Sequence, residues 1–323
     1  MRSFTVARFT LISLFVTSGC GQCSKDSKDA SELAAAQAAK PAPTASTLMS
    51  IWGSAANDIW AVGNGGVIVH WNGHEWSAPQ SPTAKNLTAV SGRAQNDVWA
   101  VGEDGVTLHF DGQQWTQTSE TDGYSQLGAW VDGAGKVWVG GVDQAMGLMR
   151  LYTGTKWEDH AISLASSLWR VWGKGDKDVW LVGSDAKVKG FIVRGDGTNF
   201  DRMPFEGASL RAIWGSASDD VWVAAYSGEV YHWNGSAWAE AERAAQGKWL
   251  GMWGAGAKDV WVVGLDGTIA HYDGARWSNV TSPTKQILWA VWGNAANDAW
   301  AVGNSGTLIH WDGQSWTCVV KQC

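Results

Sequence analysis

The sequence is poor in charge. Only 17% of its 323 residues are Asp, Glu, Lys or Arg, against roughly 25% in a typical soluble domain. The 24 basic residues are outnumbered by 31 acidic ones, which gives a formal charge of −7 and an isoelectric point near 5.5. This balance argues against nucleic-acid binding, which usually shows a basic patch or stripe. A hydrophobic content of 45% argues against an intrinsically disordered chain.

The apolar stretch near the N-terminus, residues 9–16, is short. It cannot span the bilayer hydrocarbon, which is about 30 Å thick and needs about 20 residues of helix. Arg2 and Arg8 precede it, and this order of positive and apolar regions is typical of a secretory signal peptide. The sequence therefore predicts export.

Cysteine is also scarce, with four in the whole chain. Cys20 closes the segment Thr-Ser-Gly-Cys, which resembles a bacterial lipobox, so we predict a lipoprotein-type signal peptide over 1–19 and lipidation of Cys20. The alternative is an ordinary cleaved signal peptide with an incidental cysteine. Cys318 and Cys323 are close enough to form a disulfide in an oxidising compartment, although short loops often strain such a bond and free thiols are the alternative. Cys23 would then be free.

The segment after the predicted lipid site lacks a structural pattern. Residues 20–47 are rich in Ala, Ser, Lys and Pro and show no apolar periodicity, so we predict a flexible tether. Gly21 rather than Asp follows Cys20, which by resemblance to bacterial lipoproteins implies sorting to the outer membrane.

Catalytic and metal-binding signatures are missing as well. The sequence contains no Walker A loop, no Gly-x-Ser-x-Gly and no paired Cys-x-x-Cys motif. It therefore predicts no catalytic residue, no metal and no cofactor.

The chain is rich in tryptophan and glycine, with 25 Trp and 40 Gly. The tryptophans recur, and the clearest series is spaced 39, 39, 42, 42, 39 and 39 residues apart. Its members are Trp60, Trp99, Trp138, Trp180, Trp222, Trp261 and Trp300. Periods of about 40 residues are typical of repeat architectures, and the seven copies fill residues 48–323 as one domain.

Each repeat divides into four short strands separated by turn signals. Asn-Gly or Asp-Gly pairs, the strongest short signal for a hairpin, stand before the last strand of most repeats. No repeat holds the 3.6-residue period of an amphipathic helix. The sequence therefore predicts an all-β fold, a seven-bladed β-propeller with four antiparallel strands per blade.

Two further series recur with the tryptophans and are predicted to be structural. The aspartates are Asp58, Asp97, Asp178, Asp220, Asp259 and Asp298, and the histidines are His70, His109, His232, His271 and His310. A single active site needs one set of catalytic residues, whereas these residues recur in five or six repeats. An acid/base role in catalysis is therefore disfavoured. We expect the aspartates to accept hydrogen bonds from turn backbone N–H groups and the histidines to hydrogen-bond within each blade.

The repeat reads Asp-Val-Trp-Ala-Val-Gly, then Gly-Thr-x-x-His-Trp-Asp-Gly-x-x-Trp. It resembles the Trp-rich, BNR-like repeats of secreted bacterial β-propeller lipoproteins, and it is similar to tectonin repeats and to photosystem-assembly propellers. The resemblance covers residues 48–316 and implies the fold rather than a function, because propellers host many unrelated activities. The Asp-box of sialidases is absent, and so is the recurring combination of a Gly-His and a Trp-Asp pair in each repeat that marks WD repeats.

Function is expected where the repeats differ. The third and fourth repeats gain about three residues between their second and third strands, at 141–146 and 184–190. Loops can diverge there without damage to the core. The candidate binding residues in this turn across the repeats are Glu103, Asp104, Asp143, Gln144, Asp185, Lys187, Lys189, Tyr226 and Asp266.

A second deviant position stands near the start of the innermost strand, at Thr88, Trp169, Arg211, Leu250 and Trp289. Trp169, Arg211 and Trp289 are predicted to meet at the mouth of the central channel, where they offer stacking surfaces and a cation for a sugar or peptide. The competing interpretation is that these indoles fill blade interfaces like the others.

Together these features predict a monomeric, non-enzymatic lipoprotein, anchored in the outer membrane through its N-terminal lipid alone. It would act as a binding or scaffold module for an envelope protein or a surface polysaccharide, without nucleic acid. The alternative is a carbohydrate-binding lectin. A glycosidase or polysaccharide lyase is the remaining option, and it would need paired carboxylates about 5–10 Å apart.

Overall fold

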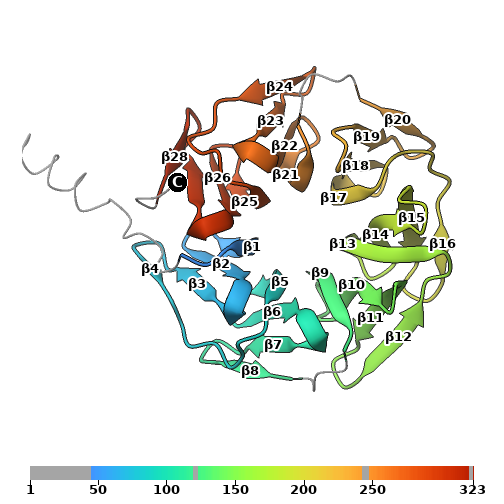
Figure 1. Ribbon diagram of the computed structural model, residues 1–323, viewed down its shortest axis with the longest axis horizontal. Coiled ribbons are helices and arrows are strands. Elements are labelled where there is room, and N and C mark those ends of the chain that lie inside the picture. Colours follow the sequence, from blue (N-terminus) through green and yellow to red (C-terminus); the bar gives the residue numbers. More distant parts are fainter. Residues whose placement is uncertain (1–44, 119–122, 242–246, 320–322) are drawn as a thin grey trace, which may run out of the picture. The chain divides into compact units, whose positions relative to one another are not determined.

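The computed structural model describes residues 45–118, 123–241, 247–319 and 323. These residues form seven four-stranded sheets whose strands follow one another in chain order and pair antiparallel (Figure 1). The seven innermost strands surround a central axis, so the fold is a seven-bladed β-propeller, as the sequence predicts. No helix of this part of the chain is long and apolar enough to cross a membrane. The predicted signal peptide, the lipidation site Cys20 and nearly all of the predicted tether lie outside the described residues.

The first four blades have the following bounds. Blade 1 contains β1 (Leu48–Ala55), β2 (Asp58–Gly63), η1 (Asn64–Gly66), β3 (Ile68–Trp71) and β4 (Trp76–Ser77). Blade 2 contains β5 (Leu87–Ala94), β6 (Asp97–Gly102), η2 (Glu103–Gly105), β7 (Thr107–Phe110) and β8 (Trp115–Gln117). Blade 3 contains β9 (Ser125–Val131), β10 (Val137–Asp143), β11 (Met146–Tyr152) and β12 (Trp157–Ala161). Blade 4 contains β13 (Ala165–Gly175), β14 (Asp178–Asp185), β15 (Gly190–Gly195) and β16 (Phe200–Arg202).

The last three blades complete the ring. Blade 5 contains β17 (Leu210–Ala217), β18 (Asp220–Ala225), β19 (Val230–Trp233) and β20 (Trp238–Glu240). Blade 6 contains β21 (Trp249–Gly256), β22 (Asp259–Gly264), η3 (Leu265–Gly267), β23 (Ile269–Tyr272) and β24 (Trp277–Val280). Blade 7 contains β25 (Leu288–Ala295), β26 (Asp298–Gly303), η4 (Asn304–Gly306), β27 (Leu308–Trp311) and β28 (Trp316–Cys318).

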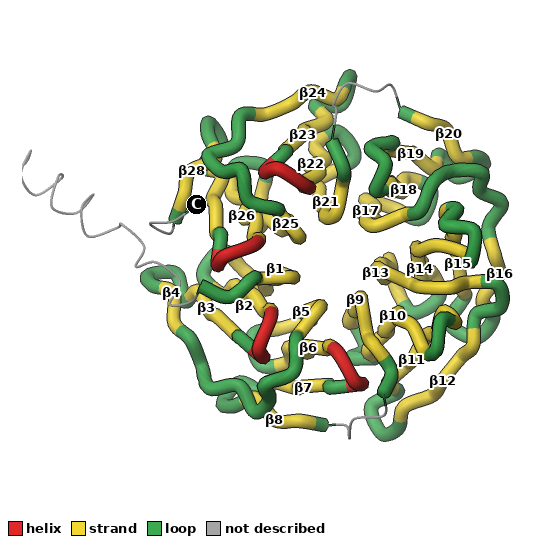
Figure 2. The backbone as a smooth tube through the Cα atoms, viewed as in Figure 1, coloured by secondary structure: helices red, strands yellow, loops and turns green. Residues whose placement is uncertain are grey.

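The antiparallel order gives the propeller two distinct faces. The turn between the second and third strands of each blade and the connection to the next blade lie at one end of the strands, which we call the turn face. The other two turns of each blade lie at the opposite end, which we call the hairpin face. The short helices η1–η4 belong to the turn face, and Figure 2 shows them in red in four consecutive blades, 6, 7, 1 and 2, on one side of the ring.

The ring closes without an exchanged strand. Blade 1 is built from β1–β4 alone and blade 7 from β25–β28 alone. The two blades meet through side chains, since Leu48, Ile51 and Trp76 of blade 1 share a buried cluster with Trp300 and Leu308 of blade 7. The other clusters also join neighbouring blades, so the hydrophobic core lies between the sheets.

The repeated tryptophan of the second strand anchors each interface. In blade 1, the Trp60 indole stacks on His70, with ring centroids 3.9 Å apart, and packs edge-on against Trp115 of blade 2. Asp58 accepts hydrogen bonds from the Trp60 indole N–H at 3.2 Å and from His70 Nε2 at 2.7 Å. The histidine–aspartate pair recurs in blades 2, 5, 6 and 7. The aspartates of these pairs therefore accept hydrogen bonds from side chains. We had expected them to accept hydrogen bonds from backbone N–H groups of the turns.

Blades 3 and 4 reach the same arrangement with other residues. In blade 4, Arg194 takes the place of the histidine, since its Nε donates to Asp178 at 2.7 Å and its guanidinium lies 4.6 Å from the Trp180 ring centroid. In blade 3, the Trp138 indole donates to Asp132, an aspartate that the repeat pattern does not identify because it stands in the preceding turn.

A second contact locks the blades together and explains why Trp and Gly are abundant in the same chain. The first-strand tryptophan of six blades covers a first-strand glycine of a neighbouring blade. A Cβ added at Gly92, for example, would lie 2.7 Å from the Trp52 ring. The pairs are Trp52–Gly92, Trp130–Gly173, Trp172–Gly215, Trp214–Gly254, Trp253–Gly293 and Trp292–Gly53. Blade 2 carries Ser91 instead, whose hydroxyl accepts a hydrogen bond from the Val131 N–H of blade 3 at 3.1 Å.

The two C-terminal cysteines are joined. Cys318, the last residue of β28, forms a disulfide with Cys323, and the two Cα atoms lie 6.1 Å apart. The bond ties the end of the chain to the outer strand of blade 7.

The buried aspartates predict how stability depends on pH. Burial acts to raise the pKa of Asp58, but hydrogen bonds from His70, Ser54 and Trp60 outweigh it and hold the pKa below its ordinary value. The pKa of Asp97 is lowered in the same way by Arg93, His109 and Trp99, against burial. The unfolded chain therefore binds protons on these carboxylates at a higher pH than the folded chain does.

We expect this contribution to stability to be fully present above the ordinary Asp pKa of about 4 and to be lost as the pH falls through the lowered pKa values of the folded chain. Urea unfolding across that range measures it. The acid-induced loss should be smaller in Asp58→Asn, in which the side chain cannot titrate. An equal loss in that variant would contradict the assignment.

Candidate functional site

Every innermost strand carries a β-bulge at the same position. The pairing with the second strand skips one residue near the start of the strand, for example Trp169 between Leu168 and Arg170. The skipped residues are Met49, Thr88, Leu127, Trp169, Arg211, Leu250 and Trp289. A bulge leaves one residue unpaired and re-aims its side chain, and here all seven line one cavity on the axis. The structure therefore brings Trp169, Arg211 and Trp289 together, one from each of three blades.

The cavity at the channel mouth is narrow and carries no acidic group. Its volume is about 50 Å³, well below the roughly 300–1,000 Å³ of pockets that enclose drug-sized ligands. Its lining consists of the seven bulged residues and Arg170, so it contains two guanidinium groups and neither carboxylate nor histidine. Its one hydroxyl belongs to Thr88, which donates to the Gln126 carbonyl at 2.6 Å.

Arg211 lies over an aromatic surface. Its guanidinium carbon stands 3.6 Å from the Trp169 ring centroid and 5.5 Å from that of Tyr226, which belongs to the turn between β18 and β19. Arg211 Nε and the Trp169 indole N–H are buried and have no hydrogen-bond partner among the described residues. Burial lowers the pKa of Arg211, which nevertheless stays charged at neutral pH.

Arg170 is a functional candidate that the sequence reasoning missed. Its Nη1 donates to the Trp169 carbonyl at 2.9 Å and to the Leu127 carbonyl at 3.3 Å. Burial and repulsion from Arg211 lower the pKa of Arg170 to about 10. A signal was present, because the same position in the other blades holds only small residues: Ser50, Ala89, Gly128, Ala212, Gly251 and Ala290.

Exposed apolar side chains lie on the same face of the propeller as the mouth of this cavity. The large hydrophobic residues that are exposed among the described residues are Met146 (60%), Leu164 (72%), Val188 (68%) and Tyr226 (38%). All four lie at the turn-face end of blades 3–5: Met146 begins β11, and the other three stand in turns or blade connections. Ala165 links three of them, because it follows Leu164, pairs with Asp185 at the start of the Val188 turn and lies against Gly147, which follows Met146. Tyr226 lies apart from these three and contacts Arg211. We call Met146, Leu164, Val188 and Tyr226 the apolar arc.

Two members of the apolar arc have a strained backbone. Leu164 and Val188 have φ values of 69° and 61°, a left-handed conformation that is an outlier for a β-branched residue such as valine. Gln144 and Ala145, which precede Met146, share this conformation. Such conformations cost on the order of 1–3 kcal/mol each and cluster at functional sites. The surrounding fold therefore holds these side chains outward.

The other predicted binding residues lie on the turn face around the ring, and most have a local role. Asp185 accepts hydrogen bonds from the N–H groups of Lys187 and Lys189, which lowers its pKa and shapes the turn, while both lysine side chains are exposed. Asp143 and Gln144 stand at the tip of the β10–β11 hairpin, where the added residues mostly extend the two strands. None of these residues contacts the cavity in the described part of the chain.

The acidic turns of blades 2 and 6 are explained by conformation and pairing. Asp104 and Asp266 occupy the left-handed position of η2 and η3, which Asp tolerates better than most residues. Asp104 forms an ion pair with Lys85, and Glu103 accepts a hydrogen bond from Asn86 at 3.0 Å.

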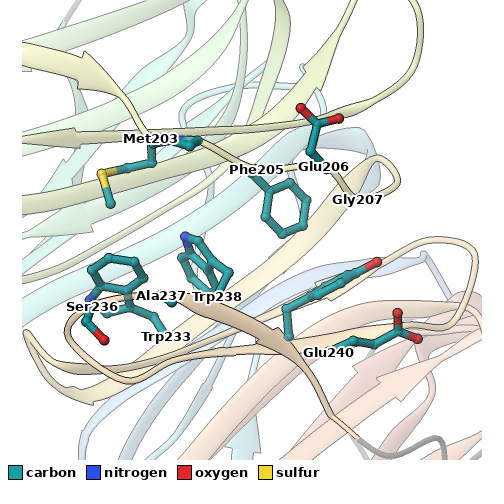
Figure 3. A pocket seen from close by; sticks show the side chains of 11 residues that line it. Met203, Phe205, Glu206, Gly207, Trp233, Ser236, Ala237, Trp238 and Glu240 are labelled. Atoms are coloured by element: carbon teal, nitrogen blue, oxygen red, sulfur yellow. The ribbon is translucent and has the colours of Figure 1, made fainter.

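A second hollow lies at the rim between blades 4 and 5. It has a volume of about 460 Å³ and is lined by the aromatic residues Phe205, Tyr231, Trp233 and Trp238, with Glu206 and Glu240. Figure 3 shows Phe205 beside the Trp238 ring and both glutamates at one end of the pocket, away from Met203 and Ser236. Blade 2 has a similar hollow of about 370 Å³ beside Phe110 and Trp115, where glutamines replace the carboxylates. Neither hollow was predicted from the sequence.

No cluster of three or more metal-binding side chains occurs among the described residues.

The chain matches no protein-family model and no curated protein sequence. It is similar in structure to YCF48 bound to D1 peptide, with 17% identity, a TM-score of 0.67, and coverage of 84% of this chain and 95% of that one. It is also similar to virginiamycin B lyase from Staphylococcus aureus, with 12% identity, a TM-score of 0.69, and coverage of 82% and 94%. The WD40 β-propeller domain of Doa1 matches with 12% identity, a TM-score of 0.66, and coverage of 85% and 95%. At these identities the likeness shows the propeller fold alone.

Proposed function

We propose that this protein is a non-enzymatic binding module, monomeric and anchored to the outer membrane through a lipid on Cys20, that holds a segment of an envelope protein on its turn face. One observation carries the proposal: the large hydrophobic side chains that are exposed among the described residues all lie on the turn face of three consecutive blades, the face that also holds the mouth of the axial cavity. Contiguous exposed apolar surface on a soluble domain marks interaction sites.

A polypeptide partner agrees better with this surface than a polysaccharide does. The apolar arc offers aliphatic side chains and strained backbone, whereas a sugar needs open aromatic faces and many polar partners. Arg211 covers one face of Trp169, and the Trp289 indole N–H is already bonded to Asn304 Oδ1 at 2.7 Å. The solved propeller in complex with D1 peptide is a precedent for peptide binding on this fold.

The absence of an enzymatic role is part of the proposal. The cavity lining offers no general acid, base or unoccupied nucleophile, since Thr88 is its one hydroxyl and is hydrogen-bonded to backbone carbonyls. Among the turn carboxylates that a glycosidase would use, Glu103 and Asp104 share one turn of blade 2, where they are engaged by Asn86 and Lys85. The others, Asp143, Asp185 and Asp266, stand on three different blades, and Asp185 is engaged by its own turn. Turnover of a polysaccharide panel by the purified protein would contradict this part.

The lipid anchor makes a direct prediction. In cells, Cys20→Ser should move the protein from the membrane fraction to the soluble fraction and abolish labelling with palmitate. Cys23→Ser is the matched control and should leave both unchanged. A Cys20→Ser protein that stays in the membrane fraction would show that the anchor is assigned wrongly.

The binding surface is tested by co-purification of the full chain from cell envelopes. The double variant Leu164→Ser/Val188→Ser should lose a discrete partner that the unchanged protein retains. The control is Gln113→Ser/Gln314→Ser, because both residues are exposed in hairpin-face turns. A partner lost equally from both variants, or from neither, would place the surface elsewhere.

The rim pocket favours a second candidate, a carbohydrate-binding lectin. Its volume falls within the range of ligand pockets, and its aromatic and acidic lining offers both stacking surfaces and hydrogen-bond acceptors. Glycan-array binding that is lost in Phe205→Ala or Glu206→Gln, and is unaffected by Gln113→Ala in the blade 2 hollow, would support it. An array without signal would count against it.

A further inference from the structure

We infer that the channel mouth is a carboxylate-binding site, in which Arg170 and Arg211 receive a carboxylate group of the polypeptide bound on the turn face. This inference rests on the proposed function and names the chemical group that the site recognises. The carboxylate belongs either to the end of the partner chain or to an Asp or Glu side chain.

The first argument is charge. The chain carries a net charge of −7, yet the cavity on its axis holds two guanidinium groups and no acidic side chain. The described lysine and arginine ion pairs involve other residues, such as Lys85, Arg93 and Arg194, and none includes Arg170 or Arg211. Burying two like charges without a counter-charge is strongly unfavourable, so a bound anion would stabilise this arrangement.

The second argument is hydrogen bonding. Arg211 Nε is a buried, charged donor without an acceptor in the described part of the protein. Trp169 Nε1 beside it is also without an acceptor, but seven other indole N–H groups of the described residues share that state, so we rely on Arg211. Buried polar groups are nearly always paired in folded proteins, so the missing partner of Arg211 is an acceptor. Water would supply acceptors but no charge, whereas a carboxylate supplies both. Arginine is the side chain best suited to planar carboxylates, through two parallel N–H···O bonds.

The third argument is size and surroundings. A cavity of about 50 Å³ admits the end of a side chain or of a chain, and not a whole sugar ring. Arg211 contacts Tyr226, a member of the apolar arc, so a segment seated in the cavity would continue across aliphatic and aromatic surface. Lys248 also lies 5.5 Å from the Tyr226 ring and adds a third cation on this side. These features fit a polypeptide with apolar residues next to its carboxylate.

The test uses the purified full-length protein labelled with ¹⁵N and four small probes, observed at the indole N–H of Trp169 and the Nε–H of Arg211. N-acetylglycine represents a chain terminus, N-acetylaspartate amide represents an acidic side chain, glucuronate represents an acidic polymer, and N-acetylglycinamide is the neutral control. We expect saturable shifts of both resonances with one or both of the first two probes. A response confined to the terminal probe or to the side-chain probe identifies the source of the carboxylate.

Two variants copy residues that other blades already hold at the same positions. Arg211→Leu matches Leu250 of blade 6, and Arg170→Ala matches Ala212 of blade 5. Each should weaken probe binding at least about tenfold, because hydrogen bonds to charged groups contribute about 1.5 kcal/mol or more. Without probe, each should unfold at a higher temperature than the unchanged protein, because an unpaired buried charge is removed. Arg276→Ala removes one exposed charge from the hairpin face and should change neither property.

Three results would overturn the inference: no shift with any carboxylate, an equal shift with the neutral amide, or undiminished binding by both arginine variants. A response to glucuronate alone would replace the polypeptide with an acidic polymer. If the envelope partner still co-purifies with Arg170→Ala and Arg211→Leu at full yield, the proposed function stands and the carboxylate site does not.

Discussion

Trp60→Ala should lower the free energy of unfolding by about 4 kcal/mol, as expected for removal of a buried tryptophan. The Trp60 side chain is 2% exposed, stacks on His70 within blade 1, and packs against Phe110 and Trp115 of blade 2. Its loss opens a cavity at a blade interface and leaves Asp58 without one of its donors. Because whole domains are stable by only about 5–15 kcal/mol, this one change should bring the propeller close to unfolding. Urea unfolding followed by circular dichroism measures the effect.

Trp289→Ala is the matched control. The substitution is the same, but Trp289 is one of three tryptophans outside the blade-anchor positions, with Trp169 and Trp249. It lies at the channel mouth, is half-buried, and bonds Asn304. We expect a stability loss of no more than about 1.5 kcal/mol, well under half of that at Trp60. Equal losses of stability at Trp60 and Trp289 would contradict the claim that the repeated tryptophans stabilise the blade interfaces and that the channel-mouth tryptophan does not.

Asp58→Ala should cost about 3 kcal/mol, because removing one partner of a buried ionic network leaves the other donors unpaired. Asp58 accepts from Ser54, Trp60 and His70, and its own side chain is 6% exposed. The same urea experiment applies. Asp58→Asn keeps one acceptor oxygen and should lose less.

An exposed aspartate serves as the control, because it shows whether the stability loss depends on the buried position of Asp58. Asp273→Ala removes an exposed carboxylate that accepts only backbone hydrogen bonds of its own hairpin turn, so we expect a loss of about 1 kcal/mol or less. A loss at Asp58 no larger than the loss at Asp273 would show that the Asp–Trp–His arrangement adds little to stability.

The fold was predictable from the sequence because the repeat is both regular and chemically strong. Trp60 and its six counterparts recur at nearly constant spacing, and hairpin signals divide each period into short strands. The same regularity predicts that the histidines and aspartates are structural. The spacing could not show which donors each aspartate receives, because Asp132 stands outside the repeated position and Arg194 replaces the histidine at its regular position.

The candidate site was predictable only in part. Deviation from the repeat pointed to Trp169, Arg211 and Trp289, which the bulges then bring to one cavity. Arg170 was missed because a bulge changes which side chains reach the axis, and the spacing of the repeat does not show this. The small residues at the matching position of the other six blades were the one signal in the sequence. The rim pocket was missed because it depends on how the connection through Phe205 crosses blade 5, a long-range packing result.

The arginines illustrate how a binding site opposes stability. Six blades hold a small residue where blade 4 holds Arg170, and the small residue is the better choice for packing between blades. An arginine at this position is therefore expected to persist for function, at the expense of stability in the free protein.

Site-specific cross-linking in cells tests the central claim most directly. A photo-crosslinking amino acid in place of Val188, on the turn face, should capture one discrete envelope protein, and the same residue in place of Gln314, on the hairpin face, should not. The Val188 product should disappear when Arg170→Ala and Arg211→Leu are added. Equal capture from both faces, or capture at Val188 that persists without the two arginines, would contradict an account in which the turn face binds a polypeptide through the channel mouth.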